Sequence, residues 1–380
     1  MPPHRTQKDE SLEALRGIAA LVVIAWHLVL GFAPARSGIF PGMDMALSWV
    51  GRPWYAIING TAAVVFFFVL SGFVLTRQAL LDGNSRRLVV GIFKRWPRLA
   101  GPAAASCAFS WMLFASGAYH FREAAAVTGS PWLADFAYSS MPPGYVPNLA
   151  DALLQGGAWT FLTGRASYNS SLWTMRWELL GSFVAFATAL LAIHLRNDRA
   201  RFALLFVAIA VAAYANMLLV AFPAGVACAL LSAQGRLPRF TAPATVLLLL
   251  LAFTMANYTE NGLLGRLSAE RWGRSLSEIL AYTVGAVLLL VAVEQNAWLR
   301  RLLSGRVARF LGRMSFPVYL LHVPVLCSAG CMAFLAAGGG RAGLLAAAGA
   351  TLLFTVLLGW PLAWFDLRWT RLINRIFTRS

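Results

Sequence analysis

The sequence predicts an all-α fold, a polytopic bundle of about ten transmembrane helices whose two termini are both cytoplasmic. The 380-residue chain is 59% hydrophobic and 12% charged, whereas about a quarter of the residues in a soluble domain are charged. Several apolar runs approach or exceed the ~20 residues that cross a bilayer. Lys and Arg are also distributed unevenly between alternate connections. We therefore expect residues 1–380 to form one transmembrane domain, with no room for a large soluble domain.

Ten apolar runs define the predicted spans, of which the fifth and sixth are short and closely joined. With the N-terminus placed inside, 23 of the 32 Lys and Arg residues fall in inner segments or at the inner ends of spans, and 8 fall in outer segments. Such an excess marks the cytoplasmic side, which favours an even number of spans. The runs cover residues 12–32, 57–80, 92–117, 171–194, 201–216, 217–233, 243–258, 277–296, 315–336 and 342–364.

The net charge of +17 would suggest nucleic-acid binding in a soluble protein. Here the basic residues occupy short connections between apolar runs, so they indicate topology and a surface that faces anionic lipid. We expect the lipid bilayer as a partner and no nucleic acid.

The cysteines indicate neither a disulfide framework nor a metal site. All four lie in apolar runs and none forms a CxxC pair, which predicts reduced, packed thiols. No other group of residues has the spacing of metal ligands. The cysteines are Cys107, Cys228, Cys327 and Cys331.

The longest predicted connection, residues 118–170, lies outside the membrane. It contains four prolines and shows no obvious helical periodicity. Connections of this length are often binding loops or lids, and the alternative is a disordered spacer. Aromatic residues favour a folded surface that contacts carbohydrate; they are Trp132, Tyr138, Tyr145 and Trp159.

The first span carries two ionisable residues on one face. Arg16 and His27 are eleven residues apart, which is three helical turns plus about 20° and ~16 Å along the axis. Ionisable residues inside a membrane helix are costly and by default indicate function. The structural alternatives are an arginine flank at the inner membrane surface and a buried histidine bonded to a neighbouring helix. The shared face favours a functional pair.

The second and third spans add small and basic residues. Ser71 and Gly72 permit close approach of another backbone, which is also a common way for membrane helices to pack. Arg95 and Arg98 share a helix face, and guanidinium forks suit a polyphosphate at the inner surface. The alternative is positive-inside charge, which is our interpretation of Lys94.

The fourth span carries a carboxylate at the depth of the first span's histidine. We expect Glu178 to lie ~10 Å from the outer surface and His27 ~22 Å from the inner one. In a ~30 Å hydrocarbon core these depths nearly coincide, and two titratable groups at one depth can form an acid–base pair. The alternative is a salt bridge between Glu178 and Arg176 or another arginine.

Two more polar residues stand near the end of the chain. Tyr319 and His322 are three residues apart, so they share a helix face, which we expect near the inner surface. His322 either orients a substrate or bonds a carbonyl, and the sequence favours neither.

Taken in order, these motifs resemble the acyltransferase 3 family over the whole chain. The combination of R-x10-H with FFxxSG is the most specific part. Two stretches depart from the family pattern: residues 174–177 are TMRW where relatives often have Ser-Leu-x-Val, and residues 316–317 are FP where Tyr-Ser is usual. The motifs are Arg16-x10-His27, Phe67-Phe68-x-x-Ser71-Gly72, Arg95-x-x-Arg98, Leu172-Trp173-Thr174…Glu178 and Gly312…Ser315-Phe316…Tyr319-Leu320-Leu321-His322.

The resemblance implies a multi-pass enzyme of the bacterial inner (cytoplasmic) membrane that O-acylates a surface carbohydrate. Such an enzyme takes acyl-CoA, here expected to be acetyl-CoA, from the cytoplasm and holds no permanent cofactor. His27 would be the catalytic base, oriented or charge-balanced by Glu178. We expect no fused SGNH hydrolase-like domain. The donor-binding residues would be Arg16, Ser71, Gly72, Arg95, Arg98, Tyr319 and His322.

Two other functional classes stay open. A transporter or flippase for an acyl donor or a lipid-linked sugar would use the same arginines, with a titrating His27 as proton relay. A structural membrane partner would tolerate loss of His27. The acceptor is also open between lipopolysaccharide, capsule or exopolysaccharide, peptidoglycan, a lipid and a small molecule.

Overall fold

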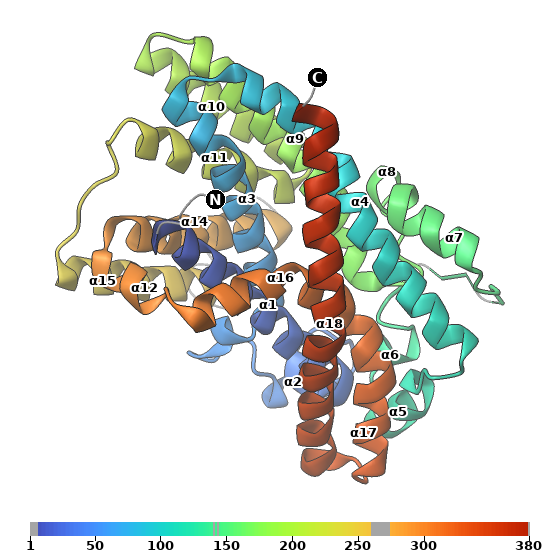
Figure 1. Ribbon diagram of the computed structural model, residues 1–380. Coiled ribbons are helices and arrows are strands. Elements are labelled where there is room, and N and C mark those ends of the chain that lie inside the picture. The colour runs from blue at the N-terminus through green and yellow to red at the C-terminus, as the bar shows by residue number, and fades with distance from the viewer. Residues whose placement is uncertain (1–6, 140, 143, 260–273, 379–380) are drawn as a thin grey trace. The chain divides into compact units, whose positions relative to one another are not determined.

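The computed structural model describes residues 7–139, 141–142, 144–259 and 274–378 (Figure 1). The chain divides into two compact units, each assembled from three stretches of sequence. Unit 1 contains Met1–Ala19, Gly51–Arg95 and Trp177–Gly312, and unit 2 contains Ala20–Val50, Trp96–Arg176 and Arg313–Ser380.

Every secondary-structure element of the described residues is a helix, which confirms the predicted all-α class. Each of the ten predicted spans lies on helix, because a long apolar run is a local signal that helix formation satisfies. The helices that carry them are α1 (Gln7–Phe32), α3 (Gly60–Asp82), α4 (Ser85–Ala115), α9 (Trp173–His194), α10 (Asp198–Ala215), α11 (Ala221–Ala233), α12 (Ala242–Ala256), α14 (Arg274–Gln295), α16 (Arg306–Val325) with α17 (Cys331–Ala336), and α18 (Gly340–Thr378).

Six helical stretches of the described chain are long and apolar enough to cross a membrane. Helices α11 and α12 are apolar but shorter, and α4 is long but carries five basic residues near its start. The chain is therefore a membrane protein, while a count of ten spans and cytoplasmic termini stay predictions. The six stretches are Glu10–Phe32, Gly60–Asp82, Ser170–His194, Ser277–Gln295, Arg306–Ala336 and Gly340–Phe377.

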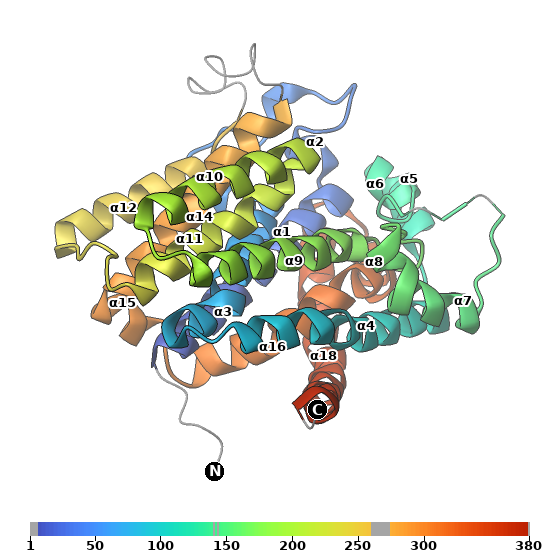
Figure 2. The ribbon, with the colours of Figure 1, turned by 90° about the horizontal axis from the view of Figure 1, so that it is seen from above.

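Unit 1 is built around the contact between α3 and α11, which lie side by side in both views (Figures 1 and 2). A Cβ atom at Gly72 would collide with the carbonyl oxygen of Phe222, and one at Gly225 with the carbonyl of Val69. These two glycines therefore let the backbones touch. Phe68 and Phe222 stack beside them, with ring centroids 5.0 Å apart.

Unit 2 contains a helix that changes its winding. Helix α16 continues through a π-helical turn, Leu326–Gly330, into α17, which packs beside α18 (Figure 1). A π turn spans five residues per hydrogen bond instead of four, which leaves a carbonyl free for another partner. Here the carbonyl of Cys327 accepts a hydrogen bond from the backbone N–H of His120, at 3.0 Å.

The 118–170 segment, whose sequence shows no obvious helical periodicity, contains several short helices. Side-chain caps start two of them: Ser130 accepts from the N–H of Leu133, and Asn148 accepts from the N–H of Asp151. The segment is thus folded, and the interpretation as a disordered spacer is wrong. Its helices are α5 (Phe121–Thr128), α6 (Pro131–Ala134), α7 (Leu149–Leu154), a π-helical turn (Gln155–Trp159) and α8 (Thr160–Leu162).

Candidate functional site

The two histidines that the sequence singled out meet in unit 2. Nε2 of His322 on α16 lies 3.0 Å from Nδ1 of His27 on α1. Nδ1 of His27 also lies 2.9 Å from the carbonyl oxygen of Val23, one turn earlier. Nδ1 of His322 lies 2.7 Å from the carbonyl oxygen of Tyr319. Both hydrogen-bond contacts that described residues make with the His27 ring fall on Nδ1, and none falls on Nε2.

The 118–170 segment covers this histidine. The indole of Trp132 on α6 stacks on the His27 ring, with centroids 5.2 Å apart and planes 28° from parallel. Ser130 donates a 2.7 Å hydrogen bond to the carbonyl of Leu30, which fixes α6 against the end of α1. His322 is fully buried, whereas His27 is partly exposed. His322 is therefore the more deeply buried residue of the pair.

Tyr319 links α16 to the start of α9 by hydrogen bonds. Its hydroxyl lies 3.0 Å from the carbonyl of Ser171 and 2.7 Å from Oγ1 of Thr174. Asn169 adds a 2.6 Å hydrogen bond from its amide to the carbonyl of Leu320. These bonds fix the start of α9 to α16, and Thr174 supplies a hydroxyl although its surrounding motif departs from the family pattern.

The helix that carries His322 begins earlier than the predicted span. Helix α16 begins at Arg306, nine residues before the predicted start of that span. His322 is consequently sixteen residues into the helix, or ~24 Å along it. The early turns were missed because their arginines resemble a cytoplasmic connection, but one of them, Arg309, pairs with Glu10 at 2.9 Å.

A second polar cluster forms in unit 1 around Glu178 of α9. Its carboxylate makes an ion pair with the guanidinium of Arg95 on α4, and the side chains of both are about nine-tenths buried. The hydroxyl of Ser71 on α3 donates to the same carboxylate oxygen, at 2.5 Å. Nε of Arg95 also donates to Ser182, at 2.8 Å. Three predicted site residues thus form one buried, charge-assisted network.

This network identifies an arginine partner of Glu178. The sequence left open a bridge to Arg176 or to another arginine, and the partner is Arg95. The guanidinium of Arg176 instead donates to the carbonyl of Thr163, at 3.4 Å. His27 belongs to unit 2 and Glu178 to unit 1, and their acid–base pairing stays a prediction.

Arg98 and Arg16 have different surroundings. Arg98 pairs with Asp366 of α18 at 3.6 Å in unit 2, next to a 2.7 Å hydrogen bond from the indole of Trp369 to the carbonyl of Pro97. The two arginines of the RxxR motif therefore have separate carboxylate partners. Arg16 is half-buried in unit 1, and the neighbouring Gly17 lies against the backbone of Leu311.

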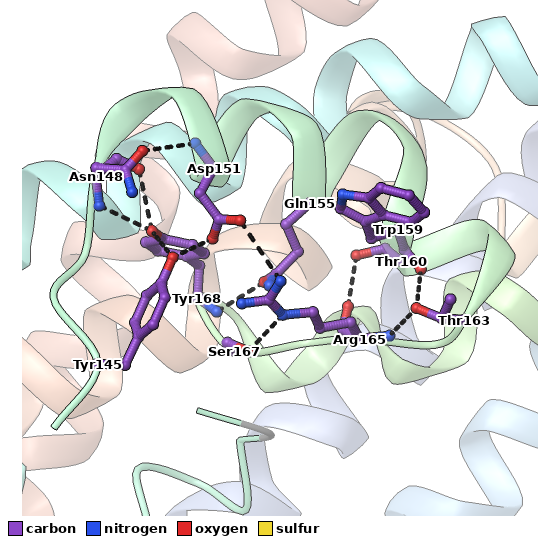
Figure 3. A network of polar contacts seen from close by, with 10 residues as sticks. All are labelled: Tyr145, Asn148, Asp151, Gln155, Trp159, Thr160, Thr163, Arg165, Ser167 and Tyr168. Atoms are coloured by element: carbon purple, nitrogen blue, oxygen red, sulfur yellow. Dashed lines mark hydrogen bonds and ion pairs between the residues drawn. The ribbon is translucent and has the colours of Figure 1, made fainter. Parts of the chain in front are cut away.

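The 118–170 segment also holds a polar network of its own (Figure 3). The phenol of Tyr145 donates to Asp151, which also pairs with Arg165 at 3.5 Å. The phenol of Tyr168 bonds the backbone N–H and carbonyl of Asn148, both at 3.0 Å. Burial, and then the bond to Tyr145, raise the pKa of Tyr168 above its usual range. The network ties the two ends of the 145–168 stretch together.

Part of the same segment is open to a ligand. The indole of Trp159, at the end of its π-helical turn, is 42% exposed. An exposed aromatic face on a rigid backbone is suited to an amphipathic ligand such as a sugar ring. Figure 3 shows this indole beside the Thr160–Thr163 turn.

Comparison with known proteins gives one match. The family model Acyl_transf_3, described as an acyltransferase domain, matches residues 9–372, nearly the whole chain. No curated protein and no solved structure matches the chain.

Proposed function

Because the chain belongs to the acyltransferase 3 family, we propose that it is a membrane O-acyltransferase of the bacterial inner membrane. It transfers an acyl group, acetyl in the simplest case, from cytoplasmic acyl-CoA to a hydroxyl of a cell-surface or exported carbohydrate. The observation that carries the proposal is His27, which stands on a membrane-type helix three turns beyond Arg16 and has Nε2 available.

Binding of acyl-CoA as the donor would account for the spacing between Arg16 and His27 along α1. The phosphates of CoA need cationic forks at the cytoplasmic surface, and arginine supplies them in bidentate form. Arg16 stands ~16 Å before His27 along the helix axis, a length that an extended pantetheine arm spans. In this proposal Arg16 and Arg98 contact phosphate and the thioester lies beside His27.

Acyl transfer then needs one base. Nε2 of His27 removes the proton from the acceptor hydroxyl while its oxygen attacks the thioester carbonyl. The C–O ester bond forms, the C–S bond breaks, and the CoA thiolate leaves and takes up the proton. Direct transfer is the simplest form, and an acyl-histidine intermediate is the covalent variant.

Glu178 keeps a place in the proposed site, but its bonds favour a different role from the predicted one. A carboxylate that is bonded to Arg95 and Ser71 orients a guanidinium. In the proposal Glu178 orients Arg95 toward the acyl donor. Ser71 bonds the same carboxylate, and Gly72 lets α3 pack closely against α11.

The acceptor side draws on the 118–170 segment. Trp132 covers His27 and Trp159 presents an exposed indole. Both support a carbohydrate acceptor that approaches over this segment, because aromatic faces bind the apolar faces of sugar rings.

The test is an acyl-transfer assay on the purified protein in lipid nanodiscs with radiolabelled acetyl-CoA. We expect the label to pass to an isolated surface polysaccharide, with release of one free thiol per acyl group. His27→Ala abolishes transfer while the protein stays folded, and His194→Ala, at an exposed position of α9, does not. Movement of intact acyl-CoA across the membrane without thiol release would establish a transporter instead.

A further inference from the structure

We propose that His322 is a positioning residue for His27: it fixes the protonation form of the His27 ring and shares the positive charge that forms there during transfer. The inference rests on the proposed role of His27 as base. It is carried by three contacts that involve only ring nitrogens and backbone carbonyls.

The first contact fixes the protonation of His322. A carbonyl oxygen only accepts hydrogen bonds, so Nδ1 of His322, 2.7 Å from the carbonyl of Tyr319, must carry a hydrogen. In a neutral imidazole the other nitrogen is then a lone-pair acceptor. Nε2 of His322, which faces His27, is therefore the acceptor.

The other two contacts then fix His27. Its Nδ1 faces two acceptors, the carbonyl of Val23 at 2.9 Å and Nε2 of His322 at 3.0 Å. Only an Nδ1–H satisfies both, as a shared donor. The opposite tautomer would direct the lone pair of His27 at the oxygen of Val23. Among the neutral forms of the two rings, a hydrogen on Nδ1 of each is the one arrangement without such a clash.

This assignment leaves the lone pair of His27 on Nε2, where a base needs it. A neutral histidine side chain in water favours the opposite tautomer, with the hydrogen on Nε2, so the protein must impose this one. Trp132 stacks on the His27 ring and restricts its rotation, and the fully buried His322 holds its nitrogen in place.

His322 also acts during the reaction. When Nε2 of His27 accepts the hydroxyl proton, its ring becomes an imidazolium and the Nδ1–H bond to His322 becomes charge-assisted. The order hydroxyl, histidine, orienting acceptor is the logic of a catalytic triad. Here a neutral imidazole stands in the third position, since no ion pair or hydrogen bond among the described residues joins a carboxylate to either ring.

The first test reads the tautomer directly and does not depend on activity. The protein is labelled with ¹⁵N-histidine in nanodiscs, and the ring nitrogens of His27 are assigned by comparison with His27→Gln. We expect the hydrogen of His27 on Nδ1. A hydrogen on Nε2, or averaging between the two forms, would overturn the inference whatever the enzyme does.

His194 is the matched internal control. Its Nδ1 lies 2.8 Å from the carbonyl of Leu190 one turn earlier, the same local contact that His27 makes with Val23. It is exposed, and no hydrogen bond or ring contact among the described residues joins it to another histidine. The difference between the two ring spectra therefore isolates what the second histidine adds.

The second test separates positioning from packing. In His322→Gln the amide oxygen replaces the Nε2 acceptor, whereas His322→Leu fills similar space without one. We expect His322→Leu to lower kcat by about 100-fold, the usual weight of general-base assistance, with an unchanged KM for acyl-CoA. His322→Gln retains most of kcat. Wild-type kcat in His322→Leu, or equal losses in both folded variants, would overturn the inference.

The two tests keep the inference separate from the proposed function. If the wild type transfers no acyl group, the function fails and the spectrum still decides the tautomer. If the wild type is active and the His27 hydrogen is on Nε2, the function stands and the role of His322 fails.

Discussion

The hydroxyl of Ser71 donates a 2.5 Å hydrogen bond to the carboxylate of Glu178, 107 residues further along the chain. Ser71 belongs to the FFxxSG motif and Glu178 follows the LWT motif, so two separate sequence signals meet at one oxygen. Arg95 joins the same oxygen. The motifs therefore encode a single buried cluster of charge and hydroxyl.

Breaking the ion pair at this cluster should destabilise unit 1. Glu178→Gln removes the carboxylate charge that pairs with the buried guanidinium of Arg95, and we expect a loss of about 3 kcal/mol in the free energy of unfolding. The loss of unfolding free energy in the double variant Arg95→Met with Glu178→Gln should be smaller than the sum of the losses in the two single variants. Denaturant unfolding in mixed micelles measures all four proteins. Additive losses would show that the two side chains are not coupled.

A methyl group at the contact between α3 and α11 should also be costly. In Gly72→Ala the new Cβ meets the backbone carbonyl of Phe222, which cannot rotate away, so we expect about 1–3 kcal/mol of destabilisation. Gly349→Ala on α18 is the matched control, because nothing lies within 4 Å of that position. The melting temperatures of the two variants provide the comparison, and equal values would contradict the packing described for Gly72.

The proposed phosphate role of Arg16 can be separated from its charge. Lysine keeps the charge and loses the bidentate fork, so Arg16→Lys should raise the apparent KM for acetyl-CoA roughly tenfold, equivalent to about 1.4 kcal/mol, with little change in kcat. Repeating the titration with a donor that lacks the 3′-phosphate tests which phosphate is bound. Arg87→Lys, at a side chain that is 56% exposed, is the control. An unchanged KM for both donors argues against phosphate binding.

The stability of the 118–170 segment should fall in alkaline solution. The folded state holds Tyr168 neutral and raises its pKa, so this contribution is complete below the unfolded pKa of about 10. It is lost as the pH rises through the folded value. Tyr168→Phe cannot ionise. We expect the stability advantage of the wild type over this variant to be constant from pH 7 to about 9 and to shrink above about 10. A constant difference up to the highest pH would contradict the burial of the phenol.

The helices could be predicted from the sequence because apolar runs and charge asymmetry are local signals. The contacts between side chains on different helices could not be predicted. Helical periodicity places His27 and Glu178 on faces, but it does not say which face of a helix hundreds of residues away is opposite. His322 is 295 residues from His27, and the sequence offered only a choice between a substrate and a carbonyl for it. The structure gives it a carbonyl on one nitrogen and His27 on the other.

The 118–170 segment shows a different limit. Its helices are only a few residues long, too short to repeat an apolar pattern, and their starts depend on single caps such as Ser130 and Asn148. Prolines and glycines dominated the sequence pattern there. The start of α16 was missed for a related reason, since the helical arginines resemble a topology signal until Glu10 is seen to pair with Arg309.

The π-helical turn after α16 has a consequence for insertions and deletions. A π turn equals an α-helix with one residue added, and here the added residue lies after His322. Every residue before it keeps its angular register with α1, while those beyond it are rotated by about 100°, the angle of one residue. A one-residue deletion within Leu326–Gly330 would therefore restore a continuous α-helix. The faces of α17 and the two histidine rings would keep their orientations, and the π turn that offers the carbonyl of Cys327 to the N–H of His120 would be lost.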